Sequence, residues 1–117
     1  MLIKDIADFV YNAPAERYLP RPERLISGHP EQSAHNQFCS ANGQFNAGVW
    51  ESEPGRWQVV YTEDEYCEIL SGQSLIHDQN GHVKVVQAGD RFVIPAGFTG
   101  IWEVVTTCKK VYVTFQA

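Results

Sequence analysis

Two segments of this chain, Glu65-Tyr66-Cys67-Glu68-Ile69-Leu70-Ser71-Gly72 and Gly89-Asp90-Arg91-Phe92-Val93-Ile94-Pro95-Ala96-Gly97, have the same general pattern. Each is a short run of strand-forming residues closed by turn residues. The pair Asn80-Gly81 stands between them, and both of its residues tolerate the positive φ angles of a tight hairpin turn. The region therefore predicts consecutive antiparallel strands.

The same alternation of runs and turns extends over residues 44–117. Each run is rich in Val, Ile, Tyr, Trp or Thr, and the predicted strands are residues 45–52, 56–62, 65–71, 74–77, 83–87, 91–94, 100–106 and 109–115. Many short strands at close and regular spacing indicate an all-β sandwich or barrel. The chain contains no internal repeat that would suggest a second domain.

The N-terminal third has a different pattern. Leu2, Ile6 and Phe9 stand near helical spacing, which predicts a short helix over residues 2–12 that Pro14 ends. Four prolines in residues 13–32 argue against a long helix or a central strand and predict an extended, Pro-rich arm. We therefore expect one domain, in which residues 1–43 form a helix and an arm that pack on a barrel of residues 44–117.

Composition narrows the function classes. A chain of 117 residues fits one domain, and its net charge of −5 argues against nucleic acid as a partner. No apolar run is long enough to span a bilayer, so no membrane partner is expected. The N-terminus does not show the basic segment followed by a long apolar segment that is typical of a secretory signal. The three cysteines are odd in number and lack CxxC spacing, which favours free thiols in a reducing compartment. The expected location is the cytoplasm.

The spacing within the two segments carries a family resemblance. Glu65 is followed by six residues and Gly72, and Gly89 is followed by five residues and Pro-x-Gly. Together the segments resemble the two halves of the cupin signature. Further matches resemble the small cupins named after the ureidoglycine aminohydrolase domain, over roughly residue 24 to the C-terminus: Gly48-Val49-Trp50-Glu51, Pro54-Gly55, Asp64-Glu65-Tyr66-Cys67, Ile94-Pro95-Ala96-Gly97-Phe98-Thr99-Gly100 and Trp102-Glu103.

This resemblance implies a fold and an assembly. The fold is a cupin-type double-stranded β-helix, a jelly-roll barrel with a pocket inside. Proteins of this branch are often dimeric, so a homodimer is expected. Activity is not implied, because one fold hosts many functions.

The chain departs from the pattern of metal-binding cupins. Such cupins typically offer a His-x-His pair before the glutamate and a third histidine after Pro-x-Gly. The matching positions here are Val59, Tyr61 and Gly100, so Glu65 alone remains. A single carboxylate cannot hold a transition metal, and we therefore expect neither a metal nor another cofactor. The histidines that flank the hairpin, His77 and His82, are expected to be solvated.

Strand alternation predicts which side chains face the pocket. Candidate ligand-binding residues are Trp50, Tyr61, Glu65, Cys67, Phe98 and Trp102. Glu65 and Tyr61 are candidate catalytic residues, because a desolvated carboxyl can act as acid or base and a phenol can donate to an oxyanion. The glycine at position 100 is expected to open room for a ligand.

Each candidate also has a purely structural interpretation. Glu65 can hold the barrel mouth by bonding to Tyr61 or to backbone N–H groups, and Cys67 can be an inert packed thiol. Glu63-Asp64 and Lys109-Lys110 are expected to lie in solvent.

The sequence is compatible with three functions. The first is a metal-independent module that binds a small molecule. The second is a metal-independent isomerase, epimerase or lyase that uses Glu65 and Tyr61 as its acid–base pair. The third, with the least support, is a residual metalloenzyme that completes its site from waters or another chain.

Overall fold

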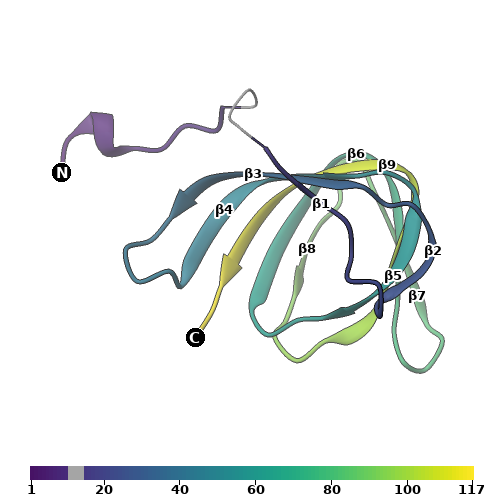
Figure 1. Cartoon of the computed structure of the whole chain (residues 1–117). Helices are drawn as coiled ribbons and strands as arrows, with labels where there is room; N and C mark the ends of the chain where they lie inside the picture. Colours follow the sequence, from purple (N-terminus) through teal and green to yellow (C-terminus); the bar gives the residue numbers. More distant parts are fainter. Residues whose placement is uncertain (11–14) are drawn as a thin grey trace.

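The computed structural model describes residues 1–10 and 15–117, and almost all of its regular structure is β-strand. Figure 1 shows the strands curled into a barrel. The predicted all-β jelly roll is confirmed. The strands are β1 (Glu16–Tyr18), β2 (Leu25–Gly28), β3 (Gln32–Cys39), β4 (Phe45–Ser52), β5 (Gly55–Val60), β6 (Asp64–His77), β7 (Val83–Gln87), β8 (Arg91–Ile94) and β9 (Thr99–Phe115).

Two long strands, β6 and β9, organise the barrel. They pair with each other in antiparallel register from Asp64↔Phe115 to His77↔Ile101. On its other edge, β9 pairs with β5 through its N-terminal half and with β4 through its C-terminal half. One layer therefore runs β1-β3-β4-β9-β6-β8 and the other runs β2-β5-β9-β6-β7. Because both layers share the long strands, the sheet folds back on itself and encloses a cavity.

The bend of β6 explains a difference from the sequence-based prediction. Residues 65–71 and 74–77 were expected to be separate strands with a turn at Gly72, but they form one strand whose register is irregular between Ile69 and Ser74. Gly72 has φ +80° at this bend, and a Cβ there would collide with the carbonyl oxygen of Thr107. Its glycine therefore marks a corner and not a chain reversal. The predicted strands 100–106 and 109–115 are likewise one strand, β9.

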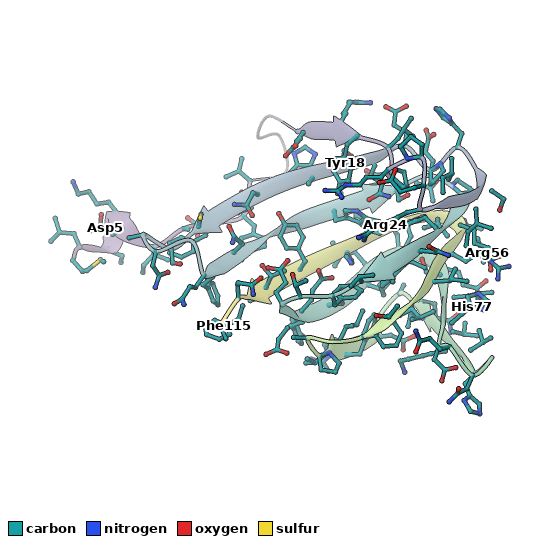
Figure 2. All side chains as sticks on the ribbon, turned by 60° about the horizontal axis from the view of Figure 1, so that its bottom comes forward. Asp5, Tyr18, Arg24, Arg56, His77 and Phe115 are labelled. Carbon is teal, nitrogen blue, oxygen red and sulfur yellow. The ribbon has the colours of Figure 1, made fainter. Side chains whose placement is uncertain are left out.

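The predicted N-terminal helix is wrong. Only a single 3₁₀ turn forms, η1 (Ile3–Asp5), in which the Asp5 carboxylate accepts a 2.7 Å hydrogen bond from the Leu2 N–H group. None of the residues in this turn is buried, so no tertiary packing stabilises a longer helix. Asp5 stands well away from the barrel in Figure 2. Pro14 and residues 11–12 of the expected helix lie outside the described residues.

The Pro-rich region contributes strands that the sequence did not indicate. β1 pairs with β3, and β2 pairs with β5, so both extend the edges of the two layers. Pro20 and Pro22 lie between β1 and β2, and Pro30 lies between β2 and β3. Prolines in the connections leave these short edge strands free to form.

The hairpin between β6 and β7 differs in detail from its prediction. Gly81 has φ +83°, but Asn80 does not have a positive φ. The turn is held instead by the Asp78 carboxylate, which accepts the N–H groups of Asn80 and His82. His82 is exposed as expected, whereas His77 is 17% exposed and lies 2.9 Å from Glu103 Oε1. The solvated interpretation was therefore wrong for His77, because it is the last residue of β6 and its side chain meets Glu103 on β9.

The core lies between the two layers beneath the pocket. Trp50, Trp57 and Trp102 pack at its centre with buried aliphatic side chains and two buried cysteines. Cys67 and Cys108 are buried free thiols, and Cys39 is an exposed free thiol. No helix in the described ranges is long and apolar enough to cross a membrane.

Candidate ligand pocket in the barrel

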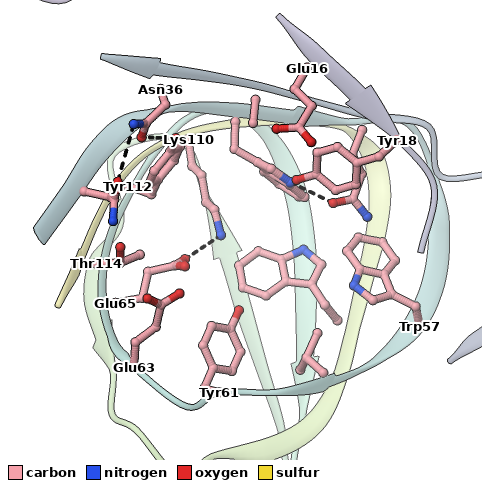
Figure 3. A pocket seen from close by; sticks show the side chains of 16 residues that line it. Glu16, Tyr18, Asn36, Trp57, Tyr61, Glu63, Glu65, Lys110, Tyr112 and Thr114 are labelled. Carbon is pink, nitrogen blue, oxygen red and sulfur yellow. Dashed lines mark hydrogen bonds and ion pairs between the residues drawn. The ribbon is translucent and has the colours of Figure 1, made fainter. Parts of the chain in front are cut away.

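A cavity of about 510 Å³ opens on the inner face of the barrel (Figure 3). Successive inward positions of one continuous stretch line it, namely residues 57, 59, 61, 63 and 65, because side chains alternate between the faces of a strand. The opposite wall comes from the even-numbered positions of β1, β3, β4 and β9. Those residues are Glu16, Tyr18, Gln32, Ala34, Asn36, Asn46, Trp50, Trp102, Lys110, Tyr112 and Thr114.

A buried ion pair lies at the base of this pocket. Lys110 is 5% exposed, and its Nζ atom lies 2.7 Å from Glu65 Oε2. The same ammonium sits 4.6 Å from the ring centroid of Trp50 and 4.4 Å from that of Trp102. A carboxylate and two aromatic faces therefore replace the water that the ammonium loses on burial.

The protonation of Lys110 follows from these neighbours. Burial by itself lowers the pKa of Lys110 and is the largest single effect, but the charge of Glu65 and the nearby Cys67 and Tyr61 side chains together outweigh it, and the pKa lies above its ordinary value. The side chain is thus a fixed cation at neutral pH. The expectation that this lysine lies in solvent is wrong, because position 110 has the same parity along β9 as Trp102 and points inward.

Cys67 lies behind Glu65 and does not line the pocket. Its side chain is fully buried, and its thiol donates a hydrogen bond to Glu65 Oε2 over 2.9 Å. Burial raises the pKa of Cys67 to about 12, so the thiol is protonated and weakly nucleophilic at neutral pH. Its geometry matches that of a packed thiol.

Tyr61 directly follows β5 and points its hydroxyl into the pocket (Figure 3). Glu65 Oε2 accepts from Lys110 and Cys67, and no hydrogen bond joins it to Tyr61 among the described residues. Burial raises the pKa of Tyr61 well above its ordinary value, so the phenol is a donor and not a base at neutral pH. Tyr61 is therefore suited to bind an oxygen atom of a ligand.

Trp50 and Trp102 form the inner wall, as their predicted orientation required. Trp50 Nε1 donates to Gln32 Oε1 over 2.9 Å, and Trp102 Nε1 donates to Ser74 Oγ over 3.1 Å. Their ring centroids are 5.8 Å apart in an edge-to-face arrangement. With both indole N–H groups bonded, the rings are fixed in orientation and present apolar surface to the cavity.

Phe98 and Gly100 lie outside this pocket. Phe98 lines a separate cavity of about 310 Å³ beside β7 and β8. A Cβ on Gly100 would collide with the His77 carbonyl oxygen, and it would approach the Phe98 ring to 2.9 Å. The expectation that Gly100 opens room for a ligand is therefore wrong, because the backbone of β6 and the Phe98 ring already fill that space.

Several pocket residues were not found from the sequence. Glu63 was expected in solvent but lines the cavity, where burial and the nearby Glu65 carboxylate raise its pKa. Tyr112 donates a 2.8 Å hydrogen bond to Asn36 Oδ1 at the far wall. Glu16 and Tyr18 were missed because β1 itself was not predicted. The alternation of side chains was the one signal that could have indicated Glu63. Glu63 lies two residues from both Tyr61 and Glu65, which were expected to face inward.

Residues 39–112, more than half of the chain, match the family model described as the EutQ-like cupin domain. The chain belongs to this cupin family. Comparison with curated proteins gave no match.

Solved structures show the same fold as this cupin. The EutQ protein of Clostridium difficile is 19% identical with a TM-score of 0.66, and the match covers 75% of this chain and 64% of that one. A protein of unknown function from Pseudomonas syringae pv. tomato is 22% identical with a TM-score of 0.80, covering 91% of this chain and 46% of that one. A predicted oxalate decarboxylase from Thermotoga maritima is 19% identical with a TM-score of 0.70, covering 96% and 99%. This cupin thus spans less than two thirds of the first two proteins.

The residues of this cupin do not fit a transition metal at the position that metal-binding cupins use. Val59, Tyr61 and Gly100 stand where metal-binding cupins have their three histidine ligands, so none of these positions supplies an imidazole. The Glu65 carboxylate is already paired with the Lys110 ammonium. No group of three or more His, Cys, Asp or Glu side chains within residues 1–10 and 15–117 is arranged to hold a metal ion. A metal at Glu65 would have to displace a buried ammonium and would gain too few ligands in exchange.

Proposed function

We propose that this cupin domain binds a small organic molecule in the barrel pocket without a metal, and that the Lys110 ammonium supplies the positive charge of the site. The observation that carries the proposal is the Lys110–Glu65 pair at the base of a cavity of about 510 Å³. Cavities of roughly 300–1,000 Å³ suit small ligands.

A buried ion pair is a poor means of stabilising a barrel. Well-packed apolar side chains in place of such a pair are often equally or more stabilising, because burying two charges costs much of what their attraction returns. This pair faces a cavity and not a closed core. Its charges are therefore placed where a ligand can meet them.

The pocket offers a defined set of contacts. The Lys110 ammonium has three N–H donors, of which one reaches Glu65, and the Tyr61 hydroxyl is a further donor. The fixed indole faces of Trp50 and Trp102 provide apolar surface beside them. A small molecule with at least one oxygen acceptor and one flat or apolar face matches these groups.

Catalysis has weaker support than binding. An isomerase, epimerase or lyase that uses Glu65 and Tyr61 needs a group able to take up a proton, and Tyr61 is a protonated donor at neutral pH. Glu65 is engaged by Lys110 and Cys67. The high pKa of Cys67, about 12, also argues against thiol chemistry.

The test is a binding screen by thermal shift and calorimetry in excess chelator, with small amines, polyols and carboxylic acids as probes. We expect at least one saturable ligand whose affinity falls about tenfold in Tyr61→Phe and in Lys110→Met, the loss expected for one charge-assisted or buried hydrogen bond. Lys84→Met is the matched control, because Lys84 is exposed and lies over Phe92 outside the pocket.

Two results would contradict the proposal. One is that no probe of any class binds. The other is that binding disappears in chelator and returns with a metal. Tyr61→Phe keeps the test informative if Lys110→Met does not fold.

Three finer predictions remain proposals. Placement in the ureidoglycine aminohydrolase-like branch is supported by the motifs at residues 48–51 and 94–100. Homodimer formation is supported by the exposed edges of β7 and β8, which each pair only with β6 among the described strands, and light scattering tests it. A cytoplasmic location is supported by the free thiols of Cys39, Cys67 and Cys108.

A further inference from the structure

We infer that the ligand of this pocket is a small organic cation, whose ammonium group lies at Glu63 between aromatic side chains of the outer half of the cavity. This inference rests on the proposed binding function and names the chemical class of its ligand. The site is outside the Glu65 position that metal-binding cupins use.

The inner half of the pocket already binds an ammonium. Lys110 Nζ lies 2.7 Å from the Glu65 carboxylate and within 4.6 Å of the ring centroids of Trp50 and Trp102. Carboxylates combined with aromatic faces are the usual means by which proteins recognise ammonium ligands. The base of the cavity therefore shows this recognition within the protein itself.

The outer half repeats those components without a cation. Glu63 and Glu16 line the cavity together with Tyr61, Tyr112 and Tyr18, and Figure 3 shows Glu63 beside Tyr61 and Glu65, with Glu16 and Tyr18 across the pocket. Neither glutamate forms an ion pair within the described ranges. An ammonium in this space would complete a second arrangement of the same kind.

The charge of the lining supports a cation. Glu16, Glu63 and Glu65 contribute carboxylates, whereas Lys110 is the one Lys, Arg or His side chain among the described lining residues. Since Lys110 is already paired with Glu65, Glu16 and Glu63 have no cation beside them among the described lining residues. A cationic group is therefore favoured at Glu63, while an oxygen acceptor elsewhere on the same ligand can still meet Lys110 and Tyr61.

The environment of Glu63 agrees with this assignment. Burial and the charge of Glu65 both raise the pKa of Glu63, although the Thr114 side chain on β9 opposes them. The ionised form of Glu63 thus has the Thr114 side chain as a hydrogen-bond partner but no cation beside it among the described residues. A bound cation would add a charged partner and favour the carboxylate form.

The test compares three probes by calorimetry in excess chelator at neutral pH. Choline is the cation, its neutral isostere carries a tert-butyl group in place of the trimethylammonium group, and acetate is the anion. We expect choline to bind saturably and the neutral isostere to bind at least about tenfold more weakly, because both fill the same volume and differ in charge. Acetate is expected not to bind.

Two variants localise the site. Glu63→Gln keeps the shape and removes the charge, and we expect it to weaken choline binding about tenfold with little change in melting temperature. Glu23→Gln is the matched control, because it makes the same change in net charge at an exposed position outside the pocket. It is expected to bind choline as the wild type does.

The outcomes separate this inference from the proposed function. Equal affinity for choline and its neutral isostere, or equal affinity of Glu63→Gln and the wild type for choline, overturns the cation assignment. Binding of polyols or carboxylic acids without binding of choline also overturns it, while the proposed function stands. If no compound of any class binds, both the cation assignment and the proposed binding function are contradicted.

Discussion

Lys110 is the residue on which the account of this pocket depends. A lysine beside another lysine at the start of a predicted strand is usually a surface feature, and nothing in its local sequence contradicts that interpretation. The structure buries it because β9 continues without a break from Trp102, so that Lys110, which pairs with Ile69 on β6, points inward and reaches Glu65. The charge of the site is therefore a consequence of strand register.

The first prediction concerns the loss of this charge. Lys110→Met leaves the Glu65 carboxylate without its cation in a largely buried position. We expect the free energy of unfolding to fall by about 3 kcal/mol, the lower end of the range for broken buried pairs, because the pocket admits water. Urea denaturation measures the change.

The double variant Lys110→Met/Glu65→Gln is the control for this prediction. Replacing the stranded carboxylate with a neutral amide should recover part of the loss. If Lys110→Met alone is as stable as the wild type, the pair does not have the buried character described here.

At the scale of elements, the alternation of side chains along the strands decided which pocket-lining residues could be predicted from the sequence. The inward series of Trp57, Val59 and Tyr61, and the inward positions of Glu65 and Trp102, followed from the period of two once the signature segments fixed the register. β1 and β2 were missed because short edge strands beside prolines carry little hydrophobic pattern, and β3 was missed because most of its residues are polar. Phe98 was placed in a loop correctly, but only tertiary packing directs its ring over Gly100 and away from the pocket.

The second prediction tests the corner of β6. Gly72→Ala places a methyl group against the Thr107 carbonyl oxygen and at 2.8 Å from Cys108 Cα, in backbone with φ +80°. We expect it to cost more than the roughly 1–3 kcal/mol of backbone strain alone, because β9 must also move.

Gly81→Ala is the matched control for the corner. Gly81 has a similar φ of +83°, but a Cβ there meets no atom within 4 Å, so only the backbone strain applies. Thermal or urea unfolding of both variants gives the comparison. Equal destabilisation would mean that the contact between Gly72 and β9 contributes nothing.

At the scale of the whole molecule, the pocket makes stability depend on alkaline pH. Burial raises the pKa of Tyr61 and raises the pKa values of Cys67 and Tyr112 to about 12. The pKa of Lys110 is also raised, because Glu65, Cys67 and Tyr61 together outweigh the effect of burial. Groups with raised pKa values keep their protons longer in the folded state than in the unfolded state. Their contribution is therefore complete below their ordinary values and is lost as pH rises above them.

The third prediction is that the protein loses stability at alkaline pH. We expect the free energy of unfolding to be steady at neutral pH and to decrease above about pH 9, with a slope of up to about 1.4 kcal/mol per pH unit for each such group. Tyr61→Phe should show a shallower decrease above pH 10, because one phenol is removed. Urea denaturation across this pH range checks both, and a stability that stays constant up to pH 12 would contradict the prediction.

The central claim is that Lys110 supplies the cationic charge of a cupin pocket that has no transition-metal site. The most direct measurement is calorimetric titration of chelator-treated, desalted protein with Zn²⁺, Mn²⁺ and Ni²⁺, beside the variant Glu65→Gln. The account predicts no saturable binding at one metal per chain that depends on Glu65. A saturable site with that stoichiometry in the wild type that disappears in Glu65→Gln would contradict it.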